Sequence, residues 1–233
     1  MQLPFFFEDD IPGSGDFFLS EESSKHITQV LRMQKDEAIH ITDGKGKLVM
    51  ASIITANKKR TEVNISNTAF ARRQGKNVAI AISLIKNSSR FEWFLEKATE
   101  IGVSEIIPLL CNRTEKQYAK MDRLRNIIVS AMLQSRQSWM PEFKEPTQFS
   151  EIVNKAGYDQ KFIAHCNDAD KKSFNNINTE FFSSIILIGP EGDFTADEIN
   201  AAIKNSYQSV SLGDTRLRTE TAGIVAAVLL LNK

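Results

Sequence analysis

Two glycine-containing stretches near the end of the chain have the residue types of a ligand-binding loop. The first, residues 189–192 (GPEG), directly follows the apolar run 185–188 (IILI). Glycine allows the backbone to approach a ligand closely or to take positive φ, and proline stiffens the turn. Because few charged side chains are present, the stretch predicts a ligand held mainly by backbone amide and carbonyl groups.

The second stretch repeats this order at residues 210–231 (VSLGDTRLRTETAGIVAAVLLL). A short apolar strand leads into the Gly213-Asp214 turn, then a loop with Arg216 and Arg218, then a helix. The small and apolar residues of this helix predict burial on nearly every side. A plain strand-to-helix turn and a core helix without chemistry remain the alternative interpretation of the two stretches.

The motifs of the common nucleotide, metal and hydrolase sites are absent from the sequence. There is no GxGxxG or GxxxxGK[ST] after a strand, no HExxH and no GxSxG. The histidines His26, His40 and His165 do not cluster, and Cys111 and Cys166 lie far apart without a CxxC pair. We therefore expect no metal site, and neither a Rossmann dinucleotide site nor a P-loop.

The charge balance of the whole chain gives no sign of a nucleic-acid partner. Lys and Arg together number 29, as do Asp and Glu, so there is no global cationic field. The distribution is uneven, however, because the segment from residue 25 to residue 73 carries many basic residues and few acids. This basic stretch is either a solvated surface or a contact for nucleic acid.

Length and patterning indicate a protein that does not enter a membrane. The 233 residues suffice for one large or two small domains. The apolar start at residues 5–7 lacks the basic segment of a signal peptide, and the apolar run 224–231 is far shorter than the roughly 20 residues that span a bilayer. Two unpaired cysteines fit a reducing compartment. We expect a cytoplasmic location.

The first seventy residues predict short strands around one helix. The helix is expected at residues 21–33, after Ser20 as its cap, with Ile27, Val30 and Leu31 on one face. The expected strands are 38–42, 48–54 and 62–65, with turns between them. This pattern is typical of a small barrel.

From about residue 73 the pattern predicts strands that alternate with longer helices, which is typical of a mostly parallel α/β layer. The expected strands are 78–85, 103–110, 161–165, 184–188 and 210–212. The expected helices begin after Ser88 or Ser89, at Arg123, after Thr195 with Glu198 in a capping box, and near Thr219. Ligands of such sheets gather beyond the carboxyl ends of the strands, where both glycine stretches lie.

These residues resemble the RsmE-type 16S rRNA (uracil-N3) methyltransferases of the SPOUT superfamily. Four stretches carry the resemblance in the same order: HITQVLRMQKDEAIHITDGKGK, EKATEIGVSEIIPLLCNRTE, IGPEGDFTADEI and SLGDTRLRTETAG. Asp193 stands where the family usually has a second glycine, and Asp tolerates left-handed φ better than most residues. The match covers nearly the whole chain.

The resemblance implies a fold, a cofactor and an assembly that periodicity alone does not reveal. The fold is α/β, with a PUA-like RNA-binding β-barrel at residues 1–72 and a SPOUT methyltransferase domain with a deep trefoil knot at 73–233. The cofactor is S-adenosylmethionine, and the assembly is a homodimer in which the partner chain completes each active site. The implied cofactor-binding residues are His165, Ile188, Gly189, Pro190, Glu191, Gly192, Leu212, Gly213, Leu217, Arg218, Thr219, Glu220, Thr221 and Ala222.

The implied reaction is methylation of N3 of a specific uridine in 16S rRNA, as naked RNA or in the assembled small ribosomal subunit. N3 must lose a proton, and the negative charge left on the ring favours a nearby cation. Arg218 is the first candidate for that cation and Arg136 the second, although an arginine in a loop is commonly a surface residue. Glu220 or Glu191 accepts the proton, or else bonds to backbone or cofactor.

A uridine within a duplex must be unstacked first, so the N-terminal domain is expected to hold RNA beyond the target base. The candidate phosphate contacts are His26, Arg32, Lys45, Lys47 and Arg72, each of which also fits a solvated cation. Two other functions stay open. One is another SPOUT RNA methyltransferase, which modifies a ribose 2′-hydroxyl or a different base, and the other is a non-catalytic RNA-binding module.

Overall fold

The computed structural model describes residues 3–73, 75–155, 157–167, 171–174 and 182–232. Backbone contacts divide the chain into two compact units. The first unit comprises Met1–Gln74 and Met132–Met140, and the second comprises Gly75–Ala131 and Pro141–Lys233. No sequence pattern predicts the second segment of the first unit.

The first unit is built on a five-stranded sheet with the order β1-β3-β4-β5-β2. Its strands are β1 Phe5–Phe7, β2 Gly15–Phe18, β3 Ala38–Thr42, β4 Lys47–Thr55 and β5 Glu62–Phe70. β1 pairs parallel to β3, and the other pairs are antiparallel. The three predicted strands are therefore present, because their alternation places one set of side chains in a core that includes Ile39, Val49 and Val63.

The helix of the first unit differs from the prediction of one helix at residues 21–33. α1 Glu21–Lys25 is capped by Ser20, as predicted, but it continues as a π-helical turn, η1 His26–Val30. The amide of Leu31 donates to the carbonyl of His26, five residues back, at 2.9 Å. This wider turn rotates the following residues, so Ile27 is buried while Val30 is 68% exposed and Leu31 41%. The predicted common apolar face is wrong for these two residues.

The segment Met132–Met140 packs onto the turn between β3 and β4. The amide of Gly46 donates to the carbonyl of Ser138 at 2.8 Å, and the amide of Met140 donates to the carbonyl of Gly44 at 2.8 Å. Gly46 has a φ of 97°, and a Cβ there would lie 2.5 Å from the Trp139 ring. Only glycine fits this position, because both the backbone conformation and the ring exclude a side chain.

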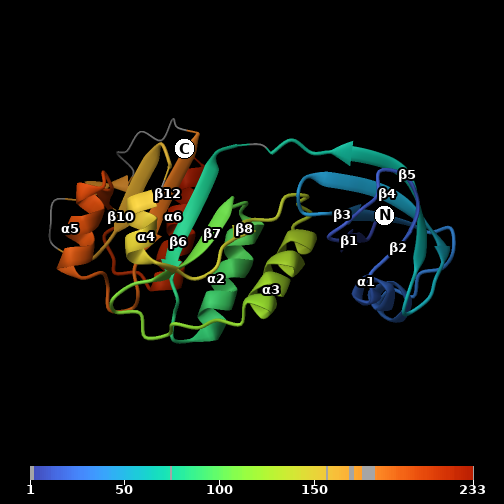
Figure 1. Cartoon of the computed structure of the whole chain (residues 1–233), viewed down its shortest axis with the longest axis horizontal. Coiled ribbons are helices and arrows are strands. Elements are labelled where there is room, and N and C mark those ends of the chain that lie inside the picture. Colours follow the sequence, from blue (N-terminus) through green and yellow to red (C-terminus); the bar gives the residue numbers. More distant parts are fainter. Residues whose placement is uncertain (1–2, 74, 156, 168–170, 175–181, 233) are drawn as a thin grey trace. The chain divides into compact units, whose positions relative to one another are not determined.

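The second unit is an eight-stranded sheet whose described pairings are all parallel (Figure 1). The order is β11-β13-β10-β12-β6-β7-β8, and β9 also pairs with β7. The strands are β6 Asn77–Ser83, β7 Glu105–Leu110, β8 Glu142–Phe143, β9 Thr147–Gln148, β10 Gln160–Ala164, β11 Lys172–Ser173, β12 Ser183–Ile188 and β13 Gln208–Ser211. The predicted α/β layer is confirmed; the sequence did not predict the two-residue strands β8, β9 and β11.

Helices cover both faces of this sheet. They are α2 Ser88–Glu100, α3 Met121–Gln134, α4 Phe149–Lys155, α5 Ala196–Lys204 and α6 Thr219–Leu231. Side chains of α4 and α5 join the core on one face, whereas α2 and α6 pack together and α6 covers β6 and β12 (Figure 1). The cap of α2 is Asn87, whose side chain accepts from the amide of Ser89, so the predicted Ser88 or Ser89 cap is wrong.

α6 packs unusually close to its neighbours on one side. A Cβ on Gly223 would lie 2.6 Å from the Phe94 ring and 2.9 Å from Ile82 Cδ1. The other side is more open, because Ile224, Val225 and Leu229 are only half-buried and Val228 is 38% exposed. The prediction of burial on nearly every side therefore holds for one half of the helix surface only.

No helix within the described ranges has the length and hydropathy of a membrane span.

Candidate active site

A cavity of about 640 Å³ opens at the carboxyl ends of β10, β12 and β13. Parallel α/β sheets bind ligands at this edge, and the volume lies within the usual range for small-molecule sites. Its wall consists of the end of β10, the loop after β12 and the loop after β13, together with Arg90 of α2 and Lys171. Three segments far apart in sequence thus form one site.

The loops after β12 and β13 are joined directly. The Thr219 hydroxyl donates to the carbonyl of Gly189 at 3.0 Å, and this hydrogen bond is buried. Gly189 itself is confined, because a Cβ there would lie 3.1 Å from the Phe194 ring. The two glycine stretches are therefore parts of a single wall.

Asp193 shapes the loop after β12 and ties it to the end of β10. Its φ is 62°, the left-handed conformation expected of a residue in the place of a glycine. The amide of Asp193 donates to the carbonyl of Pro190 at 2.9 Å, and its carboxylate accepts from the amides of Cys166 and Phe194, each at 2.8 Å. The Asp193 side chain thus does what a second glycine cannot do, since it bonds two strand ends together.

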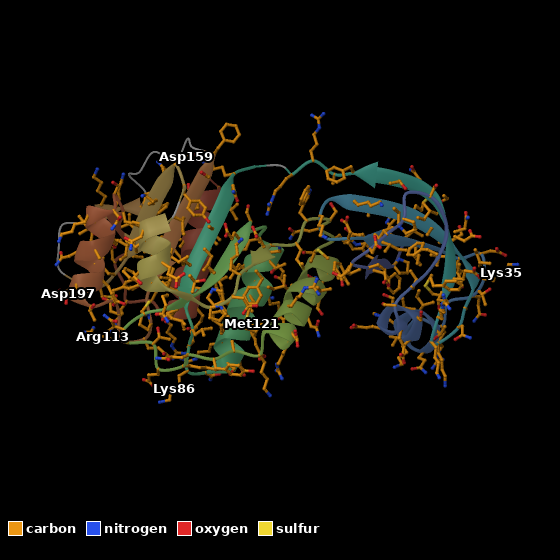
Figure 2. The ribbon with its side chains drawn as sticks, in the orientation of Figure 1. Lys35, Lys86, Arg113, Met121, Asp159 and Asp197 are labelled. Carbon is orange, nitrogen blue, oxygen red and sulfur yellow. The ribbon has the colours of Figure 1, made fainter. Side chains whose placement is uncertain are left out.

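The loop after β12 is also held from the side of β7. Arg113 donates to the carbonyl of Gly192 at 2.7 Å. Figure 2 labels Arg113 at the same end of the domain as Asp197. The amide of Asn112 donates to the buried carboxylate of Glu198 at 2.8 Å. Glu198 also forms the predicted capping box with Thr195. Several polar groups of this loop and of the helix that follows it are therefore bonded within the protein.

The loop after β13 is different because it ends at an uncapped helix. Arg218 is the N-cap residue of α6, and within the described part of the chain its side chain makes no capping hydrogen bond to the helix. Gly213, Asp214, Thr215, Arg216 and Arg218 are all exposed. The first-turn amides of a helix need partners, so they remain for water or a ligand.

His165 contributes two buried polar atoms that have no partner among the described residues. Its Nδ1 and Nε2 are both buried without a hydrogen bond, and the residue is 7% exposed. Burial lowers the pKa of the imidazole below its usual value of 6.5, and the Lys171 ammonium lowers it further, while Asp193 opposes both effects. The ring is therefore neutral near pH 7 and offers one donor and one acceptor to a ligand.

Glu220 is a second buried group with an unmet hydrogen bond. The residue is 7% exposed, and its Oε1 lies 3.6 Å from Nε of Arg90. Its Oε2 is buried and has no hydrogen-bond partner within the described part of the chain. Buried carboxylate oxygens are nearly always bonded, so this atom indicates a missing donor.

The structure gathers most of the predicted cofactor residues around the cavity. Those that line it are His165, Ile188, Gly189, Pro190, Glu191, Leu212, Gly213, Leu217, Arg218, Thr219 and Ala222. Gly192 does not line it but lies in the same loop, beside Arg113. Glu220 and Thr221 face a neighbouring cavity instead. Their roles toward a cofactor stay predictions.

Arg136, the second candidate for the catalytic cation, belongs to the first unit and is not among the residues that line the cavity. It is exposed with a φ of 56°, and its guanidinium donates to the carbonyl of Leu3 at 3.3 Å. Its catalytic role stays a prediction.

The five predicted RNA contacts all lie in the first unit. His26, Arg32, Lys45 and Arg72 are exposed. Lys47 is half-buried, and its ammonium donates to the carbonyl of Ile11. The structure leaves the RNA role of each residue as a prediction.

Sequence reasoning missed several residues of the cavity wall, of which Arg90, Lys171 and Cys166 are examples. Cys166 had a usable signal, because it directly follows a predicted strand. Arg90 is in the first turn of α2, and only the packing of α2 against α6 brings it to the site. We find no local signal for Lys171. No group of three or more His, Cys, Asp or Glu side chains suited to a metal lies in the described ranges.

Fold and cavity together define an α/β protein with a small-molecule site at the carboxyl ends of its parallel strands. A family profile described as an RNA methyltransferase domain matches residues 72–231, and one described as an RNA methyltransferase PUA domain matches residues 19–66. Because the first match covers more than half of the chain, the protein belongs to this RNA methyltransferase family. The names of its relatives identify the family as the RsmE type.

Relatives with known names agree with this assignment. The chain is 29% identical to the ribosomal RNA small subunit methyltransferase E of Buchnera aphidicola subsp. Acyrthosiphon pisum, over 97% of this chain and 91% of that protein. A protein from Porphyromonas gingivalis described as a probable rRNA-methyltransferase is 34% identical, with a TM-score of 0.90 over 97% and 95% of the two chains. The Neisseria gonorrhoeae ribosomal RNA small subunit methyltransferase E, solved bound to S-adenosyl methionine, is 28% identical, with a TM-score of 0.87 over 97% and 96%.

Proposed function

We propose that this protein transfers a methyl group from S-adenosylmethionine to N3 of a specific uridine in the 16S rRNA of the small ribosomal subunit. The observation that carries the proposal is the single cavity formed by the loops after β12 and β13, which the Thr219–Gly189 hydrogen bond joins. The names of the relatives in Buchnera and Neisseria supply the ribosomal substrate.

The residues of the cavity fit S-adenosylmethionine. An adenosine moiety needs an apolar slot with a few hydrogen-bonding groups, and Ile188, Leu212 and Leu217 line the wall. His165 offers its two unbonded ring nitrogens, and the first turn of α6 offers free amides. Basic and acidic side chains of the wall, such as Lys171 and Glu191, would face the zwitterionic amino-acid tail.

When bound, S-adenosylmethionine supplies the methyl group of its sulfonium: the N3–CH₃ bond forms as the S–CH₃ bond breaks, and the sulfur keeps the electron pair of that bond. The chain must hold N3 in line, which in well-oriented systems contributes up to about 7–11 kcal/mol. Arg218 lines the cavity and would stabilise the negative charge that N3 shares with the ring oxygens. Glu220 would accept the N3 proton, with Glu191 as the alternative.

The finer features of the fold belong to the same proposal. We include in it a deep trefoil knot formed by the loops after β12 and β13, and a PUA-like barrel formed by the first-unit sheet. The hydrogen bond from Thr219 to Gly189 and the order of the five strands support these two features. The half-buried apolar side of α6, with Val228 exposed, supports a homodimer in which this helix meets the partner chain. Domain 1–72 would then bind RNA and domain 73–233 would carry out methyl transfer.

The substrate particle and the cellular location follow from the same reaction. Unmodified small subunits and naked 16S rRNA are the two candidate substrates, and both place the protein in the cytoplasm. The four exposed cations His26, Arg32, Lys45 and Arg72 would contact phosphates beyond the target base. Binding that depends on them should weaken steeply with salt.

The test is transfer of labelled methyl from S-adenosylmethionine to small subunits that lack the modification, followed by mass mapping of the nucleotide. Label on N3 of a uridine is expected. Label on a ribose hydroxyl would instead assign the protein to another SPOUT branch. Calorimetry with S-adenosylhomocysteine separates the third function, because a non-catalytic RNA-binding module would give no heat.

A further inference from the structure

A second cavity of about 590 Å³ adjoins the first. Four residues, Arg90, Arg216, Leu217 and Arg218, line both cavities. The other residues of the second cavity are Ser89, Trp93, Glu220 and Thr221. A ligand in the second cavity would therefore contact the same loop as a ligand in the first.

The first turn of α6 separates the two cavities. Thr219 and Ala222 line the first cavity, whereas Glu220 and Thr221 line the second. Successive residues of a helix point in different directions, so one turn can present two different surfaces. This arrangement gives the cofactor and a second reactant separate places at one wall.

Glu220 shows what the second cavity lacks. Its carboxylate is buried, and Oε2 has no hydrogen-bond partner among the described residues. Oε1 is 3.6 Å from Arg90 Nε, which makes an ion pair but is too long for a good hydrogen bond. The cavity therefore presents a buried acceptor to a ligand that carries an N–H or O–H donor.

Arg90 and Arg218 add donors to the same cavity. Arginine has only donors, and a glutamate carboxylate has only acceptors. A matching ligand edge has one donor flanked by acceptors. Uracil has this edge, because N3–H lies between the carbonyl oxygens O2 and O4. Cytosine has an acceptor at N3 and an amino donor at C4, so it would place an acceptor against Glu220.

We propose that the second cavity is the binding site of the target base, in which Glu220 accepts from N3–H and Arg90 and Arg218 donate to the ring oxygens. The inference rests on the proposed function and adds to it the residues that distinguish uracil from cytosine. Trp93, which is 43% exposed and lines the cavity, provides the aromatic face on which an unstacked base packs. It is a recognition residue and takes no part in the methyl transfer.

The test measures tryptophan fluorescence of the full chain saturated with S-adenosylhomocysteine, during titration with hexauridylate or hexacytidylate. Hexauridylate should quench the fluorescence, at a half-saturating concentration at least roughly tenfold below that of hexacytidylate, as expected for a hydrogen bond to a buried charge. Glu220→Gln should bring the two oligonucleotides within about threefold of each other, because an amide can present either a donor or an acceptor. Trp93→Phe should remove most of the quenching, because the one tryptophan that remains in this variant, Trp139, does not line the second cavity.

Glu96→Gln is the matched control, because Glu96 lies on α2 beside Lys97 and lines neither cavity. It should keep the preference of the wild type. Equal quenching by both oligonucleotides in the wild type, absence of quenching, or unchanged quenching in Trp93→Phe would each overturn the proposal. Binding of S-adenosylhomocysteine by Glu220→Gln checks that this variant is folded. If subunits are still methylated at N3 in any of these cases, the proposed function stands and only the base site is wrong.

Discussion

The connections from β12 to α5 and from β13 to α6 have the same order of elements. They differ in how many hydrogen bonds the glutamate at the start of each helix accepts. Each runs from the end of a parallel strand through a glycine-containing loop into a helix, and each helix has a buried glutamate in its first turn. Glu198 of α5 accepts from the amides of Asn112 and Thr195 and from the Thr195 hydroxyl. Oε1 of Glu220 in α6 forms an ion pair with Arg90 at 3.6 Å, and its Oε2 has no hydrogen-bond partner among the described residues.

The loops themselves differ in the same way. Hydrogen bonds of Asp193 and Arg113 hold the loop after β12. Both reciprocal hydrogen bonds of the capping box, between Thr195 and Glu198, are present at the start of its helix. The loop after β13 is exposed from Gly213 to Arg216, and no side-chain cap of α6 is found in the part of the chain that the structure describes. A polar group left unbonded inside a protein costs about 1–3 kcal/mol. The first connection therefore has polar groups that are bonded within the protein, whereas the second has unbonded groups of the kind that the proposed ligand site requires.

The strongest test of this difference between the two connections is the variant Arg218→Ala, in the loop after β13. Turnover should fall roughly 10²- to 10³-fold, as when one donor to a developing negative charge is removed. The melting temperature should not change, because Arg218 is exposed. Arg123→Ala is the matched control and should keep its turnover, since Arg123 is an exposed arginine that pairs with Glu92 and does not line the cavity. Unchanged turnover in Arg218→Ala would remove this residue from the mechanism.

The same substitution in the two glutamates separates stability from function. Glu198→Gln should lower the free energy of unfolding by about 1–3 kcal/mol, because an amide group would face a donor that the carboxylate now accepts from. Glu220→Gln should change it by less than about 1 kcal/mol, since Oε2 has no donor among the described residues and the ion pair of Oε1 with Arg90 is long, at 3.6 Å. Urea unfolding measures both. Equal losses would mean that both glutamates serve the fold alone.

Asp193 tests whether the first connection is held by its side chain or by its backbone. Asp193→Ala should destabilise the protein by about 1–2 kcal/mol, because it loses two amide donors and places alanine at a φ of 62°. Asp193→Asn keeps a carbonyl acceptor and tolerates this conformation, so it should lose less. Thermal unfolding gives the order. An alanine variant as stable as the wild type would show that the loop needs neither feature.

The smallest expected effect is the contribution of His165 to the pH dependence of the free energy of unfolding. Its pKa in the folded state is lowered from 6.5, mainly by burial, so the unfolded chain takes up the proton first as the pH falls. The free energy of unfolding should therefore decrease below pH 6.5 and level off once the pH passes the lower pKa of the folded protein. In His165→Gln this part of the pH dependence should disappear. A wild-type curve that matches the variant between pH 5 and 7 would contradict the assignment.

Local signals in the sequence were sufficient wherever chemistry and spacing act over a few residues. Thr195 and Glu198 predict the capping box, and continuous apolar runs predict the buried parallel strands. The conformation of Asp193 was predicted from the family resemblance, which puts this residue in the place of a glycine, and from the tolerance of aspartate for positive φ.

Features that depend on contacts between distant segments could not be predicted. Arg90 reaches the cavity only because α2 packs on α6, and nothing near residue 90 indicates that packing. The bond from the Cys166 amide to Asp193 joins two strand ends that are 27 residues apart. The π-helical turn at His26–Val30 also defeats a prediction based on regular helical spacing.

The first unit has a consequence for biosynthesis, because its two segments are separated by more than fifty residues of the second unit. A nascent chain that has emerged only to residue 74 lacks Trp139, which covers Gly46, and lacks the amide of Met140 that bonds to Gly44. The N-terminal unit therefore cannot reach its native state vectorially, ahead of the rest. The segment Met132–Met140 leaves the ribosomal exit tunnel only after β6, α2, β7 and most of α3. The first unit therefore completes its folding only after much of the second unit has been synthesised.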